Sequence, residues 1–211
     1  MLVICAGTAT EVGKTWVGAA VLAELRRRGW AVAARKPAQS FSPEDAAEQR
    51  DAAVLAAATG EPVDAVCPPE RSYEVPMAPP MAADALGRAV PTLDELVAGI
   101  TWPDPEPAVR WVELVGGPRS PIAVDGDGVD LTTRLRPDAV VLVADAGLGT
   151  INAVVLASAP FQALGLDPIV LLNRYDEPVD LHRRNRAWLE DVCGAHVVTS
   201  AADLAARLLE G

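Results

Sequence analysis

The sequence predicts an α/β fold in which helices cover both faces of a mostly parallel β-sheet. Short apolar stretches rich in Val, Leu and Ala alternate with longer amphipathic stretches, and this alternation is typical of βαβ units with buried parallel strands. Hydrophobic residues make up 50% of the chain and aromatic residues only 4%, which suits helices that pack closely on a sheet. We expect residues 1–211 to form a single domain, because this length suits one hydrophobic core.

The first strand and helix are expected over residues 2–6 and 16–28, where an apolar run precedes apolar side chains at helical spacing. Between them lies the segment Gly7-Thr8-Ala9-Thr10-Glu11-Val12-Gly13-Lys14-Thr15, in which five residues, rather than the usual four, separate the two glycines. A Gly-rich turn between a strand and a helix offers backbone N–H groups and a helix dipole to phosphate. Lys14 adds a positive charge, and Thr15 offers a hydroxyl to Mg²⁺. The segment predicts a nucleotide-binding loop and a P-loop NTPase-like, three-layer fold of the Rossmann type.

A second strand is expected over residues 30–35, and it delivers Lys36 and Ser40 to its carboxyl end. Ligands gather at that end of the strands in open parallel sheets, so Lys36 is predicted to be a second cation for phosphate or carboxylate. An ordinary strand-end lysine is the alternative. Residues 42–59 are predicted to begin as a polar segment and continue as an Ala-rich helix that ends at Gly60. Asp51 lies within this segment, and the residues alone predict a solvated helical carboxylate there.

A long proline-rich surface loop, of the kind that often covers a site, is expected over residues 62–80. Short helices over residues 81–86 and 93–100 and a stiff linker over residues 102–107 are expected to follow. The next strand, residues 109–115, carries Glu113 just before a Gly116-Gly117 turn. A carboxylate at the end of a buried strand is costly unless it binds something, and Mg²⁺ is the ion that a nucleotide site implies. An exposed edge-strand glutamate is the alternative.

Residues 138–144 form the most apolar strand of the chain and predict a central strand buried on both faces. The Gly-rich turn after Asp145 leads into a helix expected to reach residue 164, and such a turn forms a second anion-sized site. Further strands are expected over residues 168–172 and 196–199, and helices over residues 180–192 and 201–209.

Charge and cysteine content argue against several classes of partner. The net charge of −11 disfavours nucleic acid and anionic membranes, because neither gains from an acidic surface. Cys5, Cys67 and Cys193 are far apart and odd in number, so we expect free thiols and a cytoplasmic location rather than a disulfide or zinc site. No stretch approaches the ~20 apolar residues that span a bilayer, and no export signal is expected. The two histidines lie far from any Ser or Cys pattern, which argues against a nucleophilic triad.

Several segments together resemble the dethiobiotin synthetase family in order and spacing, from residue 1 to about residue 173. They are the loop Gly7 to Thr15, Lys36-Pro37-Ala38-Gln39-Ser40, Asp51-Ala52, Met77-Ala78-Pro79, Glu113 with Gly116-Gly117, and Leu148-Gly149-Thr150-Ile151-Asn152. Members of this family carboxylate 7,8-diaminopelargonic acid with CO₂, phosphorylate the carbamate with ATP, and close a ureido ring with release of phosphate. The resemblance implies an ATP- and Mg²⁺-dependent ring-closing ligase. Such a ligase needs no protein nucleophile, because positioning and charge neutralisation allow the carbamate to attack phosphorus.

The resemblance also implies roles for individual residues. Lys14 and Lys36 would neutralise the γ-phosphate and the carbamate, while Thr10 and Ser40 would orient the substrate. Mg²⁺ would be held by Thr15, Asp51 and Glu113. The nucleotide would be bound by Glu11, Val12, Gly13, Lys14, Thr15 and Trp16, with Asn173 reading adenine. The chain would work as a homodimer in which the substrate carboxylate is bound across the interface by Gly149, Thr150 and Asn152.

Some positions depart from the family pattern. Ala9 stands where the family usually has Asp, Phe41 and Leu114 replace glycines, and residues 197–199 lack the Pro of the base-binding loop. The bulk of Phe41 and Leu114 predicts a narrowed or reshaped substrate pocket. Two alternatives stay open: a non-catalytic nucleotide-binding relative with a regulatory or assembly role, and a partition-type ATPase. The latter usually carries an extra lysine early in the loop, where this chain has Thr8 and Ala9.

Overall fold

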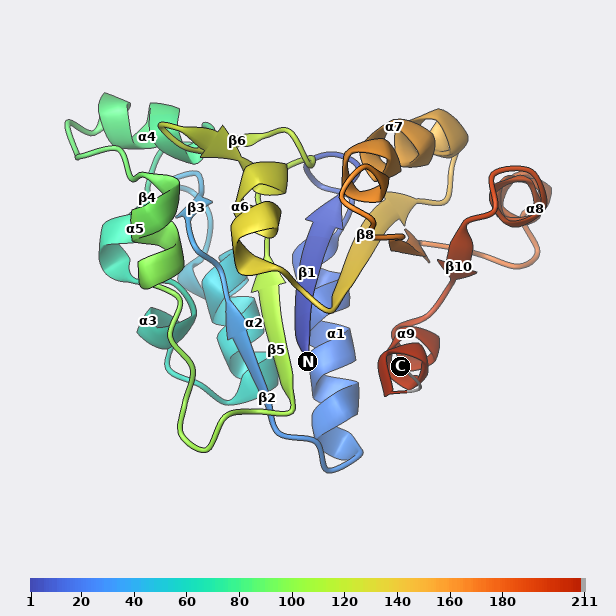
Figure 1. Ribbon diagram of the computed structural model, residues 1–211, viewed down its shortest axis with the longest axis horizontal. Coiled ribbons are helices and arrows are strands. Elements are labelled where there is room, and N and C mark those ends of the chain that lie inside the picture. The colour runs from blue at the N-terminus through green and yellow to red at the C-terminus, as the bar shows by residue number, and fades with distance from the viewer. Residues whose placement is uncertain (210–211) are drawn as a thin grey trace.

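The computed structural model describes residues 1–209, which form a central sheet between two layers of helices (Figure 1). Within these residues the main sheet has six strands, all parallel to their neighbours. From one edge to the other they are β10 (His196–Val198), β9 (Ile169–Asn173), β8 (Ala139–Asp145), β1 (Leu2–Gly7), β5 (Val109–Glu113) and β2 (Val32–Arg35). The predicted α/β class and parallel sheet are confirmed.

Strand β1 shows how the sheet divides the core into two halves. Ile4 and Ala6 belong to the hydrophobic cluster on one face, whereas Val3 and Cys5 belong to the cluster on the other. Side chains alternate between the faces of a strand, and all residues of β1 are buried. Strands buried on both faces have continuous apolar sequences, which explains the apolar runs at β1 and β8.

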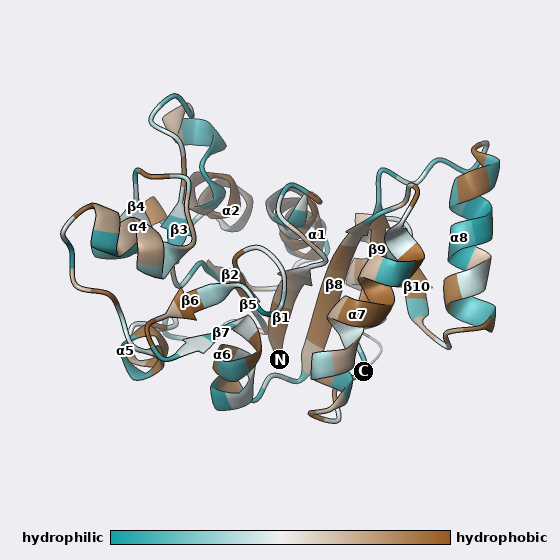
Figure 2. Ribbon diagram, turned by 90° about the horizontal axis from the view of Figure 1, so that it is seen from above, coloured by the Kyte–Doolittle hydropathy of each residue, from teal (hydrophilic) through white to brown (hydrophobic). Residues whose placement is uncertain are grey.

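Helices α1 (Lys14–Arg27), α2 (Asp51–Thr59) and α9 (Ala201–Leu209) pack on the face that carries Val3 and Cys5. The opposite face is covered by α4 (Pro79–Ala85), α5 (Leu93–Ala98), α6 (Gly128–Leu135), α7 (Thr150–Gln162) and α8 (Asp180–Asp191). Figure 2 shows α1 and α2 on one side of the sheet and α6 and α7 on the other. None of the helices in residues 1–209 is long and apolar enough to cross a membrane.

The expected single helix over residues 42–59 is wrong at its start. Residues Ala47–Gln49 form a separate 3₁₀ turn (η1), Arg50 is extended with φ −66° and ψ 143°, and α2 begins only at Asp51. Asp51 is therefore the first residue of a helix, and its carboxylate contacts Lys36 and Thr15. Asp51 is thus helical as expected, but its carboxylate, although 39% exposed, is paired with Lys36 and Thr15 instead of being bound by solvent alone. The break coincides with a tertiary contact between Arg50 and Phe41, which local sequence patterns do not reveal.

The prediction of a loop over residues 62–80 is wrong in part, because this segment contains short helices and a short strand. They are α3 (Val63–Val66), the 3₁₀ turn η2 (Pro69–Arg71), β4 (Ser72–Tyr73) and the start of α4. β4 pairs in parallel with β3 (Gln39–Ser40), and we call this pair the β3–β4 ribbon. Elements of two to four residues are too short to show a hydrophobic period.

An antiparallel pair and a helix follow β5 without having been expected. The pair is β6 (Pro121–Ala123) with β7 (Gly126–Asp127), and α6 begins directly after it. Asp127 caps α6 by accepting hydrogen bonds from the Val129 and Asp130 N–H groups, and the Asp130 side chain accepts one from the Asp127 N–H. Such a reciprocal capping box is a helix-start signal. The sequence therefore contained a signal for this helix at residues 127 and 130.

Candidate active site

The segment between β1 and α1 forms a tight loop at the carboxyl edge of the sheet. β1 ends at Gly7, α1 begins at Lys14, and Gly13 caps the helix in the left-handed region with φ 91°, a conformation that favours glycine. The Thr8 N–H donates to the Val143 carbonyl of β8 at 2.9 Å. A Cβ at Gly7 would lie 2.9 Å from the Ala9 carbonyl oxygen. Strand, loop and helix therefore follow one another as a phosphate-binding loop requires.

Lys14 lies along this loop. Its Nζ donates to the Ala9 carbonyl at 3.2 Å, and the residue is 7% exposed. Burial lowers the pKa of Lys14, and the ammonium of Lys36 lowers it further. A partly desolvated ammonium gains much from an anionic partner, so the loop presents a cation suited to phosphate.

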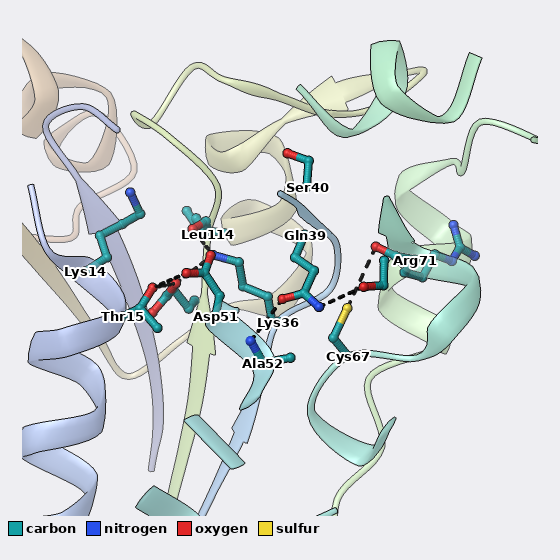
Figure 3. Close-up of polar contacts among 12 residues, drawn as sticks. Lys14, Thr15, Lys36, Gln39, Ser40, Asp51, Ala52, Cys67, Arg71 and Leu114 are labelled. Carbon is teal, nitrogen blue, oxygen red and sulfur yellow. Dashed lines mark hydrogen bonds and ion pairs between the residues drawn. The ribbon is translucent and has the colours of Figure 1, made fainter. Parts of the chain in front are cut away.

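Lys36, just after β2, lies between two carboxylates. Its Nζ is 2.6 Å from Glu113 Oε1 and 2.7 Å from Asp51 Oδ2. The Thr15 Oγ1 is 2.7 Å from Asp51 Oδ1 and 2.8 Å from Glu113 Oε1. Figure 3 shows Thr15, Lys36 and Asp51 pointing toward one another. The structure thus joins Thr15, Lys36, Asp51 and Glu113 in one set of contacts, which we call the Lys36 cluster.

The charges in the Lys36 cluster compensate one another. Burial raises the pKa of the Glu113 carboxyl, although Lys36 opposes this shift. Burial acts in the same direction on Asp51, but Lys36 and Thr15 outweigh it and hold the pKa of Asp51 below its ordinary value. Burial alone would lower the pKa of Lys36, yet the two carboxylates raise it. Lys36 therefore stays charged, and its pairing is what makes burial of these groups tolerable.

The oxygen atoms of the cluster fit a magnesium ion. Two carboxylates and a hydroxyl are hard ligands of the kind that Mg²⁺ combines with phosphate oxygens and water. Glu113 Oε2 is buried and has no hydrogen-bond partner among the described residues, and a buried oxygen of this kind calls for a cation or a water. No group of three or more His, Cys, Asp or Glu side chains in residues 1–209 could hold a metal alone. Phosphate oxygens and water would therefore have to complete the coordination.

A hollow of about 540 Å³ lies beside the loop and the Lys36 cluster. Most of the predicted site residues line it, namely Thr10, Glu11, Gly13, Lys14, Thr15, Trp16, Lys36, Ser40 and Asp51. The remaining lining residues are Gln39, Glu48, Gln49, Val54, Val115 and Gly116. The sequence does not indicate Glu48 and Gln49, because the 3₁₀ turn η1 that carries them has no sequence signature, or Val54, which lies within α2.

Comparison with known proteins agrees with this geometry. The sequence profile of a family described as "AAA domain" matches residues 2–201. A protein of Rhodopirellula baltica named ATP-dependent dethiobiotin synthetase is 34% identical over 92% of this chain and 81% of its own length. The proteins of that name from Anaeromyxobacter dehalogenans and Streptomyces coelicolor are 38% and 32% identical, over 80% and 92% of this chain and 74% and 80% of their own. The chain belongs to the dethiobiotin synthetase family. Among solved structures, the signal recognition particle 54 kDa protein of Aeropyrum pernix aligns with a TM-score of 0.45 and 16% identity, over 95% of this chain and 42% of that one.

Asn173, to which the family resemblance assigns adenine, lies at the end of β9 beside the loop. Its Nδ2 donates to the Val12 carbonyl at 2.9 Å, and a Cβ at Gly13 would lie 2.2 Å from that nitrogen. The next residue, Arg174, donates to the Glu11 carbonyl at 3.2 Å and pairs with Asp145 at 2.9 Å. Asn173 and Arg174 thus brace the loop of this dethiobiotin synthetase relative. Asn173 and Val12 do not line the hollow that contains Lys14.

The residues predicted to act from a partner chain lie outside this hollow. Gly149 caps α7 with φ 93°, and Thr150 and Asn152 lie in the first turn of that helix. The Thr150 Oγ1 is buried without a partner among the described residues, whereas Asn152 is exposed. Within one chain, the structure does not bring these residues together with Lys14 and the Lys36 cluster.

The side chains expected to narrow the pocket point elsewhere. Leu114 is fully buried in the core on the side of α6, where a Cβ at Gly128 would lie 3.0 Å from it. Phe41 lies against the guanidinium of Arg50. Neither lines the hollow, whereas Val115 does. Neither side chain therefore narrows this hollow, and alternation along the chain turns Leu114 to the face opposite Glu113. A reshaped substrate pocket stays a prediction.

Proposed function

We propose that this protein catalyses the dethiobiotin synthetase reaction, in which 7,8-diaminopelargonic acid, CO₂ and ATP give dethiobiotin, ADP and phosphate. The observation that carries the proposal is the arrangement of one hollow. Lys14, Thr15, Lys36 and Asp51 line it, and Glu113, which does not line it, contacts Lys36 and Thr15, on a chain that belongs to this family. The lysines supply positive charge for the ATP phosphates and the anionic carbamate, and the oxygen ligands suit Mg²⁺.

The reaction needs charges and positions rather than a protein nucleophile. One amine of the substrate adds to CO₂ and loses a proton, which gives a carbamate. A carbamate oxygen then bonds to the γ-phosphorus while the bond from that phosphorus to the bridging oxygen breaks, and ADP leaves. The second amine attacks the carbamoyl carbon and loses a proton, the bond from that carbon to the phosphate-bearing oxygen breaks, and phosphate leaves as the ring closes. Each step joins groups that binding has already placed together.

The residues of the hollow divide this work. Lys14 lies on the loop and offsets the charge that accumulates on the γ-phosphoryl group. Lys36, which also lines the hollow, pairs with the carbamate in place of one of its present carboxylate contacts. Mg²⁺, when bound by Thr15, Asp51 and Glu113, neutralises phosphate charge and orients the phosphoryl group. Thr10 and Ser40 line the hollow and orient the substrate. The loop from Glu11 to Trp16 binds the phosphates, and Asn173 contacts adenine.

We further propose a homodimer that completes each site. Exposed apolar side chains lie on and next to α7, with Leu148 92% and Leu156 67% exposed. A second hollow, of about 510 Å³, runs from Thr8 and Gly117 to Leu156, so this apolar face continues toward the loop. A partner chain that covers it would bring its Gly149-Thr150 turn to the substrate carboxylate, which suits the N–H groups at a helix N-terminus.

A cytoplasmic location is part of the proposal. The chemistry consumes ATP and bicarbonate, and Cys5, Cys67 and Cys193 are free thiols in the described residues, which suits a reducing compartment.

Phosphate release provides the test of the proposed function. Purified protein with ATP and Mg²⁺ is assayed with and without diaminopelargonic acid and bicarbonate. The proposal predicts that phosphate release requires both, and that Lys14→Ala abolishes it. Phosphate release that is unaffected by the diamine would indicate a different ATPase, and nucleotide binding without any turnover would indicate a non-catalytic relative.

A further inference from the structure

We propose that Gln39 is a positioning residue that fixes the Asp51 carboxylate and thereby sets the affinity of the metal site. The inference rests on the proposed Mg²⁺ role of Asp51 and extends it to a residue outside the Lys36 cluster. Gln39 itself has no contact with Lys36, Thr15 or Glu113 among its hydrogen bonds in residues 1–209. It acts through the start of helix α2.

Helix α2 begins without a cap of its own. The Arg50 side chain, at the N-cap position, makes no capping hydrogen bond, and the first N–H groups of a helix have no partner within it. The Ala52 N–H instead donates to Gln39 Oε1 at 2.9 Å. Figure 3 shows the Gln39 carboxamide directed at Ala52. A side chain from another element therefore caps the helix on which Asp51 is the first residue.

Gln39 is itself held in place. Its Nε2 donates to Ser72 Oγ at 2.8 Å, across the β3–β4 ribbon in which these two residues are paired. The residue is 4% exposed. Both ends of the carboxamide are thus occupied, and the oxygen that holds Ala52 has one orientation. Because both ends of this buried carboxamide are hydrogen-bonded, the position of the ribbon fixes the position of the first turn of the helix.

Contacts with the ribbon flank Asp51 on both sides. Ala52 follows Asp51 and is bound by Gln39, whereas Arg50 precedes it and places Cζ 3.8 Å from the centre of the Phe41 ring. Phe41 is tied to β4, because its N–H donates to the Tyr73 carbonyl at 3.0 Å. The ribbon and the residue that follows β3 therefore contact the residues on both sides of Asp51. Of the two contacts, the one from Gln39 is a directed hydrogen bond in a buried place, so we assign the positioning to Gln39.

The position of Asp51 matters because of what Mg²⁺ demands. Mg²⁺ requires near-ideal octahedral geometry with oxygens at about 2.0–2.1 Å, so a small displacement of one carboxylate weakens binding. The Asp51 side chain is 39% exposed, and packing alone does not fix it. Its place depends on Lys36, on Thr15 and on the backbone at the start of α2. Loosening that backbone therefore lowers metal affinity while the loop that binds nucleotide stays intact.

The test is a titration of the full chain with Mn²⁺ in the presence of ADP. Mn²⁺ is paramagnetic, so its electron spin resonance signal reports how tightly it binds. Gln39→Met has nearly the same volume and cannot bond Ala52, and it is expected to weaken Mn²⁺ binding about fivefold, the worth of one hydrogen bond. Gln39→Glu keeps an acceptor for the Ala52 N–H and is expected to bind Mn²⁺ more tightly than Gln39→Met. Ser72→Ala removes only the support of Gln39 and is expected to have a smaller effect, about twofold. The affinity for ATP with a metal chelator present should stay within about twofold for all three variants.

Asp51→Asn serves as the reference, because it removes a proposed ligand. If Asp51→Asn weakens Mn²⁺ binding and Gln39→Met does not, the role of Gln39 is refuted and the proposed function stands. If neither weakens it, the assignment of Asp51 as a metal ligand fails. An equal loss of metal and chelated-ATP affinity in Gln39→Met would show a general structural role and would also overturn the inference. If Gln39→Met does not fold, Gln39→Glu is compared with the wild type instead. A fivefold loss of Mn²⁺ affinity in Gln39→Glu would contradict the role of the acceptor oxygen.

Discussion

Lys36 Nζ lies 2.6 Å from Glu113 Oε1, and the two side chains are 2% and 0% exposed. Removal of one partner of such a buried pair leaves an uncompensated charge, which typically costs about 3–5 kcal/mol. The same lysine contacts Asp51 at 2.7 Å. A substitution that changes the charge of the Lys36 cluster is therefore expected to lower the stability of the fold as well as to alter the site.

Replacing Glu113 by glutamine tests the metal assignment. Glu113→Gln keeps the shape of the side chain but removes the charge, so we expect a several-fold higher Mg²⁺ concentration for half-maximal activity and a lower free energy of unfolding. Asp51→Asn is expected to shift the Mg²⁺ requirement in the same direction. Asp94→Asn is the control, because Asp94 forms an exposed ion pair with Arg134, away from the cluster and the loop. An unchanged Mg²⁺ requirement in both cluster variants would reject the assignment.

The lowered pKa of Lys14 predicts a pH dependence of nucleotide affinity. Burial and Lys36 place this pKa below the ordinary 10.5, and only the ammonium form attracts phosphate. The ATP affinity is therefore expected to fall as the pH rises through the lowered pKa, at a lower pH than an ordinary lysine would require. Lys36 stays charged over this range, because its pKa is raised.

Calorimetric titration with ATP and Mg²⁺ at increasing pH measures this effect. Lys14→Arg is the control, since arginine keeps its proton throughout the range; its affinity, whatever the absolute value, should not change with pH. A wild-type affinity that is constant up to pH 10.5 would contradict the expected role of the lowered pKa.

Alanine substitutions at Gly13 and Gly29 can be compared to test whether Asn173 stabilises the loop. Both glycines are left-handed, with φ 91° and 88°, but a Cβ at Gly13 would lie 2.2 Å from Asn173 Nδ2, whereas nothing lies within 4 Å at Gly29. Gly29→Ala should cost only the conformational term of about 1–2 kcal/mol. Gly13→Ala should cost more, because it also displaces Asn173, and it should weaken ATP binding. Equal losses in urea unfolding would show that Asn173 does not brace the loop.

Mixed dimers test the shared site. In a dimer of one Lys14→Ala chain and one Asn152→Ala chain, a shared site collects both defects at one position and neither at the other. About half of the wild-type activity should then survive, whereas dimers that carry either substitution in both chains should be inactive. Two separate sites would each carry one defect, so the mixed dimer would be as inactive as its parents. A monomer in sedimentation that still turns over the diamine would also contradict the dimer.

The sequence predicts those parts of the site whose functional residues are close together in the sequence. The loop from Gly7 to Thr15 is such a part, because strand, turn and helix follow one another within it. Glu113 was also found, since a carboxylate at the end of an apolar strand is conspicuous. For Leu114, the period of two along β5 places the side chain on the face opposite Glu113, so its direction away from the hollow was predictable.

Asp51 and Gln39 could not be placed in this way. The environment of Asp51 depends on the break at Arg50, which coincides with a contact to Phe41, nine positions earlier in the chain. The role of Gln39 depends on a two-residue pairing with β4, which is too short to have a pattern. These features arise from tertiary contacts, and these override local propensity.

The proposed reaction closes a ureido ring on a diamine at the expense of ATP. It can be followed by mass spectrometry of the product formed from diaminopelargonic acid, ATP and ¹³C-bicarbonate. We expect dethiobiotin that carries the label at its ureido carbon, formed in equal amount to ADP and lost in Lys14→Ala. ADP formed from ATP in the presence of the diamine without any labelled dethiobiotin would contradict it.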